Sequence, residues 1–376
     1  MNARSVNGRL RFLDGLRAVA ALAVLFHHLY YNSDFERIFS SALPPWFAGF
    51  AELCARGVQV FFVISGFVIA YSVRNLWIDR RTALNFALRR QIRLDPPFWI
   101  CLVLAVIDLA IVARVHPDLA PAPTLGAFVL NFLYLPGVAH APMYLSVAWT
   151  LCLEVQFYLV FILLLWVAQL RWRRVISVAG IFLLGIGSLA FRARLTNDDY
   201  PWFIGSFYLF AAGVLVCWVM LRKAPLWLLV IYASAMLAVG VLREQQTILA
   251  GFAITALIYL SAVCGRLDVW LSGRIFQYFG RISYSLYLVH LPILTRVYRA
   301  GLRITPQSFW AGLLWLTVGL LLSIVAAHLL NRYVEEPAKR LSSRLKARRA
   351  TAPERPEPAI LRIEEPRPAT VSADAF

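Results

Sequence analysis

Charged side chains are scarce in this sequence. Asp, Glu, Lys and Arg make up 15% of its 376 residues, whereas apolar residues make up 60%. Soluble domains are usually about 45–50% apolar, so this chain has too little polar surface to cover one soluble core. We therefore predict an integral membrane protein that is all-α and has many spanning helices.

The chain also lacks the cysteine patterns of disulfide frameworks and metal sites. Its five cysteines are scattered, mostly through apolar runs, and no two of them form a Cys-x-x-Cys pair. We interpret them as small core residues and expect no metal. The formal charge of +17 would suit nucleic acid in a soluble protein. In a membrane protein it is explained by Lys and Arg in cytoplasmic loops, so we expect no nucleic-acid partner.

About ten apolar stretches are long enough to cross a bilayer, which takes roughly 20 residues. The expected spans are 12–30, 56–74, 95–114, 145–167, 175–192, 203–221, 225–242, 246–263, 282–300 and 309–331. The run 125–135 is too short and is expected to be re-entrant or interfacial. The sequence therefore predicts a bundle of about ten transmembrane helices.

Basic residues are biased toward one side of these spans. Six arginines occur from Arg74 to Arg93 inclusive, and further Lys and Arg fill alternate loops on the side of the N-terminus. This bias predicts that both termini are cytoplasmic, and we expect a multi-pass protein of the inner (cytoplasmic) membrane. Residues 1–340 form the predicted transmembrane domain. Residues 341–376, rich in Pro, Arg and Glu, form a predicted disordered cytoplasmic tail.

The first span carries polar and charged side chains, whose burial in hydrocarbon is energetically unfavourable. Arg17 and His28 are eleven residues apart, which is three helical turns plus roughly 20°, so both lie on one face about 16 Å apart along the axis. His27 is rotated roughly 100° from that line. Snorkelling of Arg17 and an interfacial role for His28 are the structural alternatives. The placement of Arg17 and His28 on one helix face favours a functional role over these structural ones.

Two further motifs carry charge. In "RRQIRLDPPFW", Arg90 and Arg93 are one turn apart and can face one ligand, and guanidinium groups suit phosphate oxygens. The positive-inside rule alone would also place arginines there. In "AWTLCLEVQFYLV", Glu154 lies near the membrane middle, where it must face a cavity, be protonated or pair with a cation. A structural ion pair with a neighbouring helix is the alternative to function.

Taken in order, these motifs resemble the acyltransferase 3 family of membrane-bound acyltransferases. The resemblance covers about residues 9–340. It is carried by "LDGLRAVAALAVLFHH", "GVQVFFVISGFVI", "RRQIRLDPPFW", "WTLCLEVQFY", "FYLFAAGVLV", "GRISYSLYLVH" and "VEEPAKR". The chain departs from the usual pattern at Val155, where many members have a second Glu, and at Thr150 and Cys152, where others have Ser.

The resemblance implies an O-acyltransferase with a ten-helix bundle. It would take an acyl group, acetyl as the expected one, from cytoplasmic acyl-coenzyme A to a hydroxyl of a glycan or lipid-linked saccharide. His28 then corresponds to the essential histidine, with Arg17 as its partner and Glu154 as the motif glutamate. Arg90 and Arg93, together with Arg17, correspond to contacts for the donor's phosphates.

These residues suggest a mechanism and leave two rivals open. His28 would act as general base or carry the acyl group itself, and Glu154 would orient the imidazole if the fourth span packs on the first. The flexible arm of acyl-coenzyme A would run along the helix face that Arg17 and His28 share. A secondary transporter of an anion or lipid-linked saccharide is the first rival. A structural scaffold whose polar residues hold helices together is the second.

Overall fold

The computed structural model describes residues 10–31, 43–115, 121–168, 173–195, 201–306 and 308–345, and in these ranges it is helical without a strand. Its helices are α1 (Arg11–Tyr31), α3 (Pro45–Cys54), α4 (Gly57–Ser72), α5 (Arg80–Val115), α6 (Leu125–Phe132), α7 (Trp149–Val167), α8 (Arg173–Arg192), α9 (Phe207–Met220), α10 (Leu226–Leu242), α11 (Gln246–Val263), α12 (Arg274–Ile304), α13 (Phe309–Leu330) and α14 (Glu336–Arg344). Short turns η1 (Ser146–Ala148), η2 (Phe203–Gly205) and η3 (Asn331–Glu335) join some of them.

Seven helical segments of the described chain are long and apolar enough to cross a membrane. They are Arg11–Tyr31, Pro45–Ser72, Arg80–Val115, Ser146–Val167, Val175–Arg192, Gln246–Val263 and Phe309–Arg344. α9 and α10 are apolar but shorter, and α12 is long, with 31 residues, but is not among the seven. Helices therefore lie over all ten expected ranges. The all-α membrane class is confirmed, while the count of ten spans and the side of the termini stay predictions.

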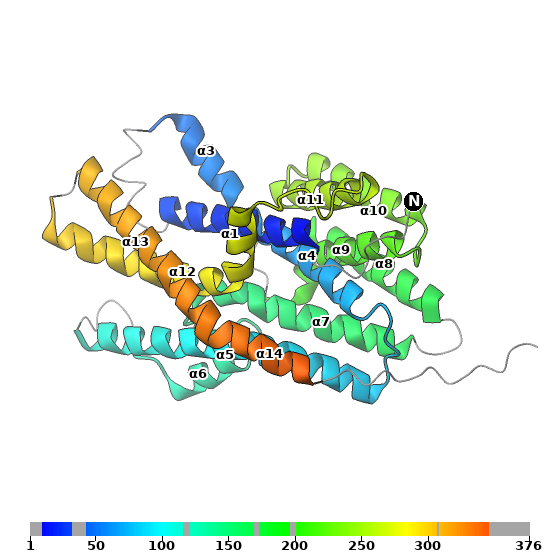
Figure 1. Cartoon of the computed structure of the whole chain (residues 1–376), viewed down its shortest axis with the longest axis horizontal. Coiled ribbons are helices and arrows are strands. Elements are labelled where there is room, and N and C mark those ends of the chain that lie inside the picture. Colours follow the sequence, from blue (N-terminus) through cyan, green and yellow to red (C-terminus); the bar gives the residue numbers. More distant parts are fainter. Residues whose placement is uncertain are drawn as a thin grey trace, which may run out of the picture.

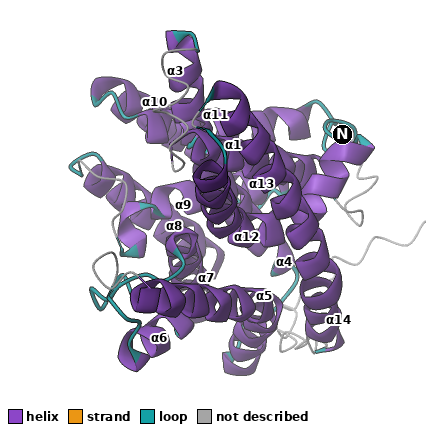
Figure 2. Ribbon diagram, turned by 90° about the vertical axis from the view of Figure 1, so that its left-hand side faces the viewer, coloured by secondary structure: helices purple, strands orange, loops and turns teal. Residues whose placement is uncertain are grey.

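The long helices lie side by side along the long axis of the molecule (Figure 1). α1 lies inside the bundle, where it contacts α3, α4 and α12. α12 also packs along α13, and α4 packs along α9 (Figure 2). This arrangement brings the motifs on α1, α4, α5, α7 and α12 to a shared interior, although up to 270 positions of sequence separate them.

Helix α5 is longer than the expected third span. It runs for 36 residues and includes Pro96 and Pro97 in its interior, whereas the sequence suggested a span beginning at residue 95. At 1.5 Å per residue it is about 54 Å long, which exceeds the roughly 30 Å of a hydrocarbon core. Its first turns therefore extend beyond the core, and Arg90 and Arg93 lie on the same continuous helix as the apolar part.

The last spanning helix also continues further than its apolar run. α13 passes through the π-helical turn η3 into α14, which reaches Arg344. Glu335 does not end the helix. Its buried carboxylate accepts hydrogen bonds from Ser285 and Asn331 and pairs with Lys339. Residues 341–344 of the predicted tail are thus helical, and 346–376 lie outside the described residues.

Glycines on α4 and α9 set the closest helix contact near the site. A Cβ built on Gly66 would lie 2.0 Å from the carbonyl oxygen of Phe210, and one on Gly213 would lie 1.9 Å from that of Val63. The two backbones therefore approach each other more closely than any other residue would permit. Gly66 and Gly213 thus permit close packing of these two helices.

We expect Gly213→Ala to force α4 and α9 apart and to lower the free energy of unfolding by about 1–3 kcal/mol, the usual cost of overpacking. The measurement is thermal unfolding of the purified protein in detergent. Gly187→Ala on α8 is the control, since no atom lies within 4 Å of its added Cβ. Equal melting temperatures for the two variants would contradict the tight contact.

Candidate active site

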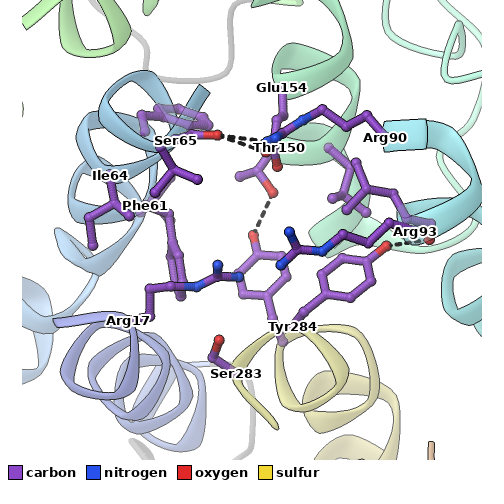
Figure 3. A pocket seen from close by; sticks show the side chains of 16 residues that line it. Arg17, Phe61, Ile64, Ser65, Arg90, Arg93, Thr150, Glu154, Ser283 and Tyr284 are labelled. Carbon is purple, nitrogen blue, oxygen red and sulfur yellow. Dashed lines mark hydrogen bonds and ion pairs between the residues drawn. The ribbon is translucent and has the colours of Figure 1, made fainter. Parts of the chain in front are cut away.

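Four of the five predicted site residues line one cavity between α1, α4, α5, α7 and α12. They are Arg17, Arg90, Arg93 and Glu154, and we call the space the central cavity (Figure 3). Its polar lining also includes Ser65, Thr150, Ser283, Tyr284 and Tyr287. Charged groups of the lining carry three positive charges against one negative charge. The cavity thus has an excess of positive charge and suits an anionic ligand.

An ion pair joins α5 and α7 at this cavity. The Arg90 guanidinium pairs with the Glu154 carboxylate, and the Ser65 hydroxyl on α4 donates to the same carboxylate oxygen at 2.7 Å. The two charged side chains are only 14% and 22% exposed. Glu154 therefore has the cation that its position in the membrane requires, and three helices meet at one carboxylate.

The other two arginines have no such partner among the described residues. Arg17 and Arg93 point into the central cavity from opposite sides (Figure 3). Neither guanidinium makes a hydrogen bond or ion pair with any residue in the described ranges, and the Arg17 Nε atom is buried. Arginine side chains held at a cavity with unused donors are suited to carboxylate or phosphate oxygens.

A second cavity adjoins the first near the start of α1. It shares Arg17, Val68 and Arg93 with the central cavity. Its other charged residues are Asp14, Arg89, Arg281, Glu335, Glu336 and Lys339. Basic side chains outnumber acidic ones five to three among its lining residues, so we call it the basic cavity. A ligand that enters here meets positive charge before it reaches the central cavity.

His28 lies apart from the arginines, in a third cavity. This histidine cavity is lined by His27, His28, Arg56, Gln59 and Trp149, among others. It shares Val58 and Tyr287 with the central cavity. Arg17 and His28, which share one face of α1, therefore both line cavities and do not face lipid. The three cavities adjoin in series, with the arginines at one end and His28 at the other.

The structure gives His28 a different partner from the one that the sequence suggested. Glu154 does not contact its imidazole, because that carboxylate is held by Arg90 and Ser65. Instead His28 Nδ1 lies 2.9 Å from Nε2 of His290 on α12. His27 also lines the histidine cavity, with its Nδ1 3.0 Å from the Ala51 carbonyl oxygen. The two histidines, which lie roughly 100° apart around α1, therefore have different hydrogen-bond partners but line the same cavity.

Two residues that the sequence did not assign to the site also reach it. His290 is one, and Tyr287, at the junction of two cavities, is the other. The Thr150 hydroxyl donates to the Tyr287 hydroxyl at 3.0 Å. Two features of the sequence pointed to them: both belong to the motif "GRISYSLYLVH", and they lie three residues apart, which puts them on one face of a helix. Within the described ranges, no three His, Cys, Asp or Glu residues gather in a way that could hold a metal ion.

Comparison with known families gives a match over most of the chain. A family model described as an acyltransferase domain matches residues 10–332. The matched range contains every residue named above at the central and histidine cavities. No solved structure matches the chain.

Curated relatives agree with the family match. Nodulation protein 10 of Rhizobium leguminosarum bv. viciae is 25% identical over 91% of this chain and 97% of its own length. The exopolysaccharide production protein ExoZ of Rhizobium meliloti is 29% identical over 79% of this chain and 92% of its own length. The peptidoglycan O-acetyltransferase OatA of Listeria monocytogenes is 24% identical over 87% of this chain but only 55% of its own length.

We expect the Arg90–Glu154 pair to be worth more to stability than a surface pair. Glu154→Leu leaves a guanidinium without its partner in a largely buried place and should lower the free energy of unfolding by roughly 3 kcal/mol. Arg90→Met should cost a similar amount, and the double variant should recover part of the loss, with a coupling energy of about 1–3 kcal/mol. Denaturation in detergent measures all three.

The pair between Lys339 and Glu336 is the control, because it lies beyond the expected last span and its side chains are 24% and 35% exposed. Glu336→Ala should cost no more than about 1 kcal/mol. Strictly additive losses in the Arg90→Met/Glu154→Leu double variant would show that the two side chains do not stabilise each other.

Proposed function

This chain belongs to the acyltransferase 3 family, and from that we propose that it moves an acyl group from acyl-coenzyme A to a hydroxyl of a glycan or lipid-linked sugar. It is a membrane acyltransferase, and family membership does not favour the rival function of secondary transport. Acetyl is the expected acyl group, since OatA is by name an O-acetyltransferase. A saccharide acceptor agrees with the names of OatA and ExoZ, which refer to peptidoglycan and exopolysaccharide.

The arginines support a donor with phosphate groups. Coenzyme A carries a diphosphate and a 3′-phosphate, and it needs cations that are not already paired. Arg17 and Arg93 line both the basic and the central cavity, and neither makes a hydrogen bond or ion pair with the described residues. They are the best candidates for these phosphates, whereas Arg90 is occupied by Glu154.

The order of the cavities supports a path for the acyl arm. The basic cavity adjoins the central cavity, which adjoins the histidine cavity through Val58 and Tyr287. Arg17 and His28 lie about 16 Å apart along α1. The donor's phosphates would stay with the arginines, on the face predicted to be cytoplasmic. Its uncharged pantetheine arm would carry the thioester toward His28 and the acceptor.

We assign the role of general base in the acyl transfer to His28. As general base it would take the proton of the acceptor hydroxyl while the oxygen attacks the thioester carbonyl carbon. The carbon–sulfur bond then breaks, and the departing thiolate takes the proton from His28. The products are the acylated acceptor and free coenzyme A. The observation that carries the proposal is the placement of His28 at the end of a cavity series that begins with unpaired arginines.

We expect His28→Ala to abolish release of labelled acetyl groups from acetyl-coenzyme A, whether to water or to an acceptor. General-base catalysis is worth about 10²–10⁴-fold in rate, so the residual rate should fall by at least 10²-fold. His27→Ala is the matched control, because His27 lines the same cavity and is hydrogen-bonded to a backbone carbonyl instead of His290. Full activity in a folded His28→Ala protein would refute the assignment.

We expect Arg93→Ala to raise the KM for acetyl-coenzyme A at least tenfold, because a charge-assisted phosphate contact contributes about 1.5–3 kcal/mol. Titration of the purified protein with donor gives KM and kcat separately. Arg81→Ala is the control for charge, since Arg81 is exposed on the first turn of the same helix. An unchanged donor KM in Arg93→Ala, with loss of stability alone, would favour a structural role.

A further inference from the structure

His290 is a buried histidine whose two ring nitrogens both have partners. Only 1% of the residue is exposed. Its Nδ1 lies 3.0 Å from the backbone carbonyl oxygen of Leu286, one turn earlier on α12, and its Nε2 lies 2.9 Å from Nδ1 of His28. The His28 and His290 rings are 5.1 Å apart between centroids and inclined by 28°. The two rings thus form one hydrogen-bonded unit between α1 and α12.

The Leu286 carbonyl fixes the tautomer of His290. A carbonyl oxygen can only accept a hydrogen bond, so His290 Nδ1 must carry the proton that is donated to it. A neutral imidazole carries one proton, which leaves Nε2 with a free lone pair. His290 Nε2 is therefore an acceptor, and it faces His28.

A charged His290 would reverse this assignment, but its surroundings oppose the charge. An imidazolium that is almost completely buried needs a carboxylate or several acceptors to offset its lost hydration. No carboxylate in the described ranges forms an ion pair with His290. The ring-to-ring contacts of His290 are with His28 and Tyr287, and the histidine cavity adds His27 and Arg56 nearby. None of these groups supplies negative charge.

The tautomer of His28 follows from that of its neighbour. Because His290 Nε2 accepts, His28 Nδ1 must donate and therefore carries the proton. His28 Nε2 is then unprotonated and free to take a proton from a hydroxyl in the histidine cavity. Since a histidine side chain in water prefers the Nε2–H tautomer, the protein has to impose the Nδ1–H tautomer, and a buried acceptor does so.

We propose that His290 is a positioning residue that holds His28 in the Nδ1–H tautomer, with Nε2 presented to the acceptor. The proposal rests on the proposed function, in which His28 is the general base. When Nε2 takes the hydroxyl proton, the imidazolium keeps its Nδ1–H bond to His290, which stabilises the new charge. When the thiolate takes that proton, the pair returns to its starting state. His290 thus takes part in each turnover without contacting either substrate.

The test that does not depend on activity is a nitrogen NMR spectrum of the whole protein labelled with ¹⁵N-histidine in detergent. The chain has six histidines, and the signals of His28 are identified by their loss in His28→Gln. In the wild type we expect a protonated Nδ1 and an unprotonated Nε2 on His28. In His290→Leu, which keeps bulk but removes the acceptor, the His28 signals should shift toward the Nε2–H tautomer.

Two conservative variants guard against a protein that fails to fold. His290→Gln can place its amide oxygen near the position of Nε2 and accept from His28. His290→Asn can reach the Leu286 carbonyl but is too short to reach His28. We expect His290→Gln to keep the His28 tautomer and most of kcat for acetyl-coenzyme A, whereas His290→Asn should lose kcat by about 10²-fold or more. The donor KM should be unchanged in both, because the arginines are not disturbed.

The outcomes separate this inference from the proposed function. A protonated Nε2 on His28 in the wild type would overturn the inference even if His28→Ala is inactive. Equal His28 tautomers and equal kcat in the Gln and Asn variants would overturn it as well. An active His28→Ala protein would instead overturn the general-base role, and the spectrum would still report whether His290 sets the tautomer.

Discussion

The ion pair between Arg90 and Glu154 is the contact on which the interior of this protein depends. It places a carboxylate from α7, a guanidinium from α5 and the Ser65 hydroxyl of α4 at one point within the membrane. Without a cation, Glu154 would be too costly in hydrocarbon. With it, three helices hold a polar cavity open between them, and Arg17 and Arg93 can project into that cavity with donors that no described residue uses.

Much of this site follows from helix geometry within single segments. The eleven-residue spacing of Arg17 and His28 predicted a shared face, and both side chains do line cavities. The three-residue spacing of Arg90 and Arg93 likewise predicted that both could face one space, as they do. The apolar runs predicted an all-α membrane fold. These inferences succeeded because they use only rise, rotation and hydropathy along one helix.

Contacts between helices far apart in sequence were beyond that reasoning. His28 and His290 are 262 positions apart, and no local pattern indicates that α12 packs on α1. The sequence instead suggested Glu154 as the partner of His28, on the condition that the fourth span packs on the first. The structure pairs Glu154 with Arg90, which the resemblance had given as a contact for the donor's phosphates and the positive-inside rule would also have placed there. Two helices also run past the expected spans, before residue 95 and after residue 331, because hydropathy marks the part of a helix that suits lipid and not the ends of the helix.

The distance between Arg17 and His28 has a consequence for energetics across the membrane. In the proposed path the charged part of the donor never leaves the arginines, and only an uncharged arm spans the gap. Each turnover carries an acyl group one way and a hydrogen atom the other way, both within neutral groups. The overall transfer is therefore electroneutral, so the electrical potential of the membrane neither drives nor opposes it, and the thioester bond alone supplies the free energy.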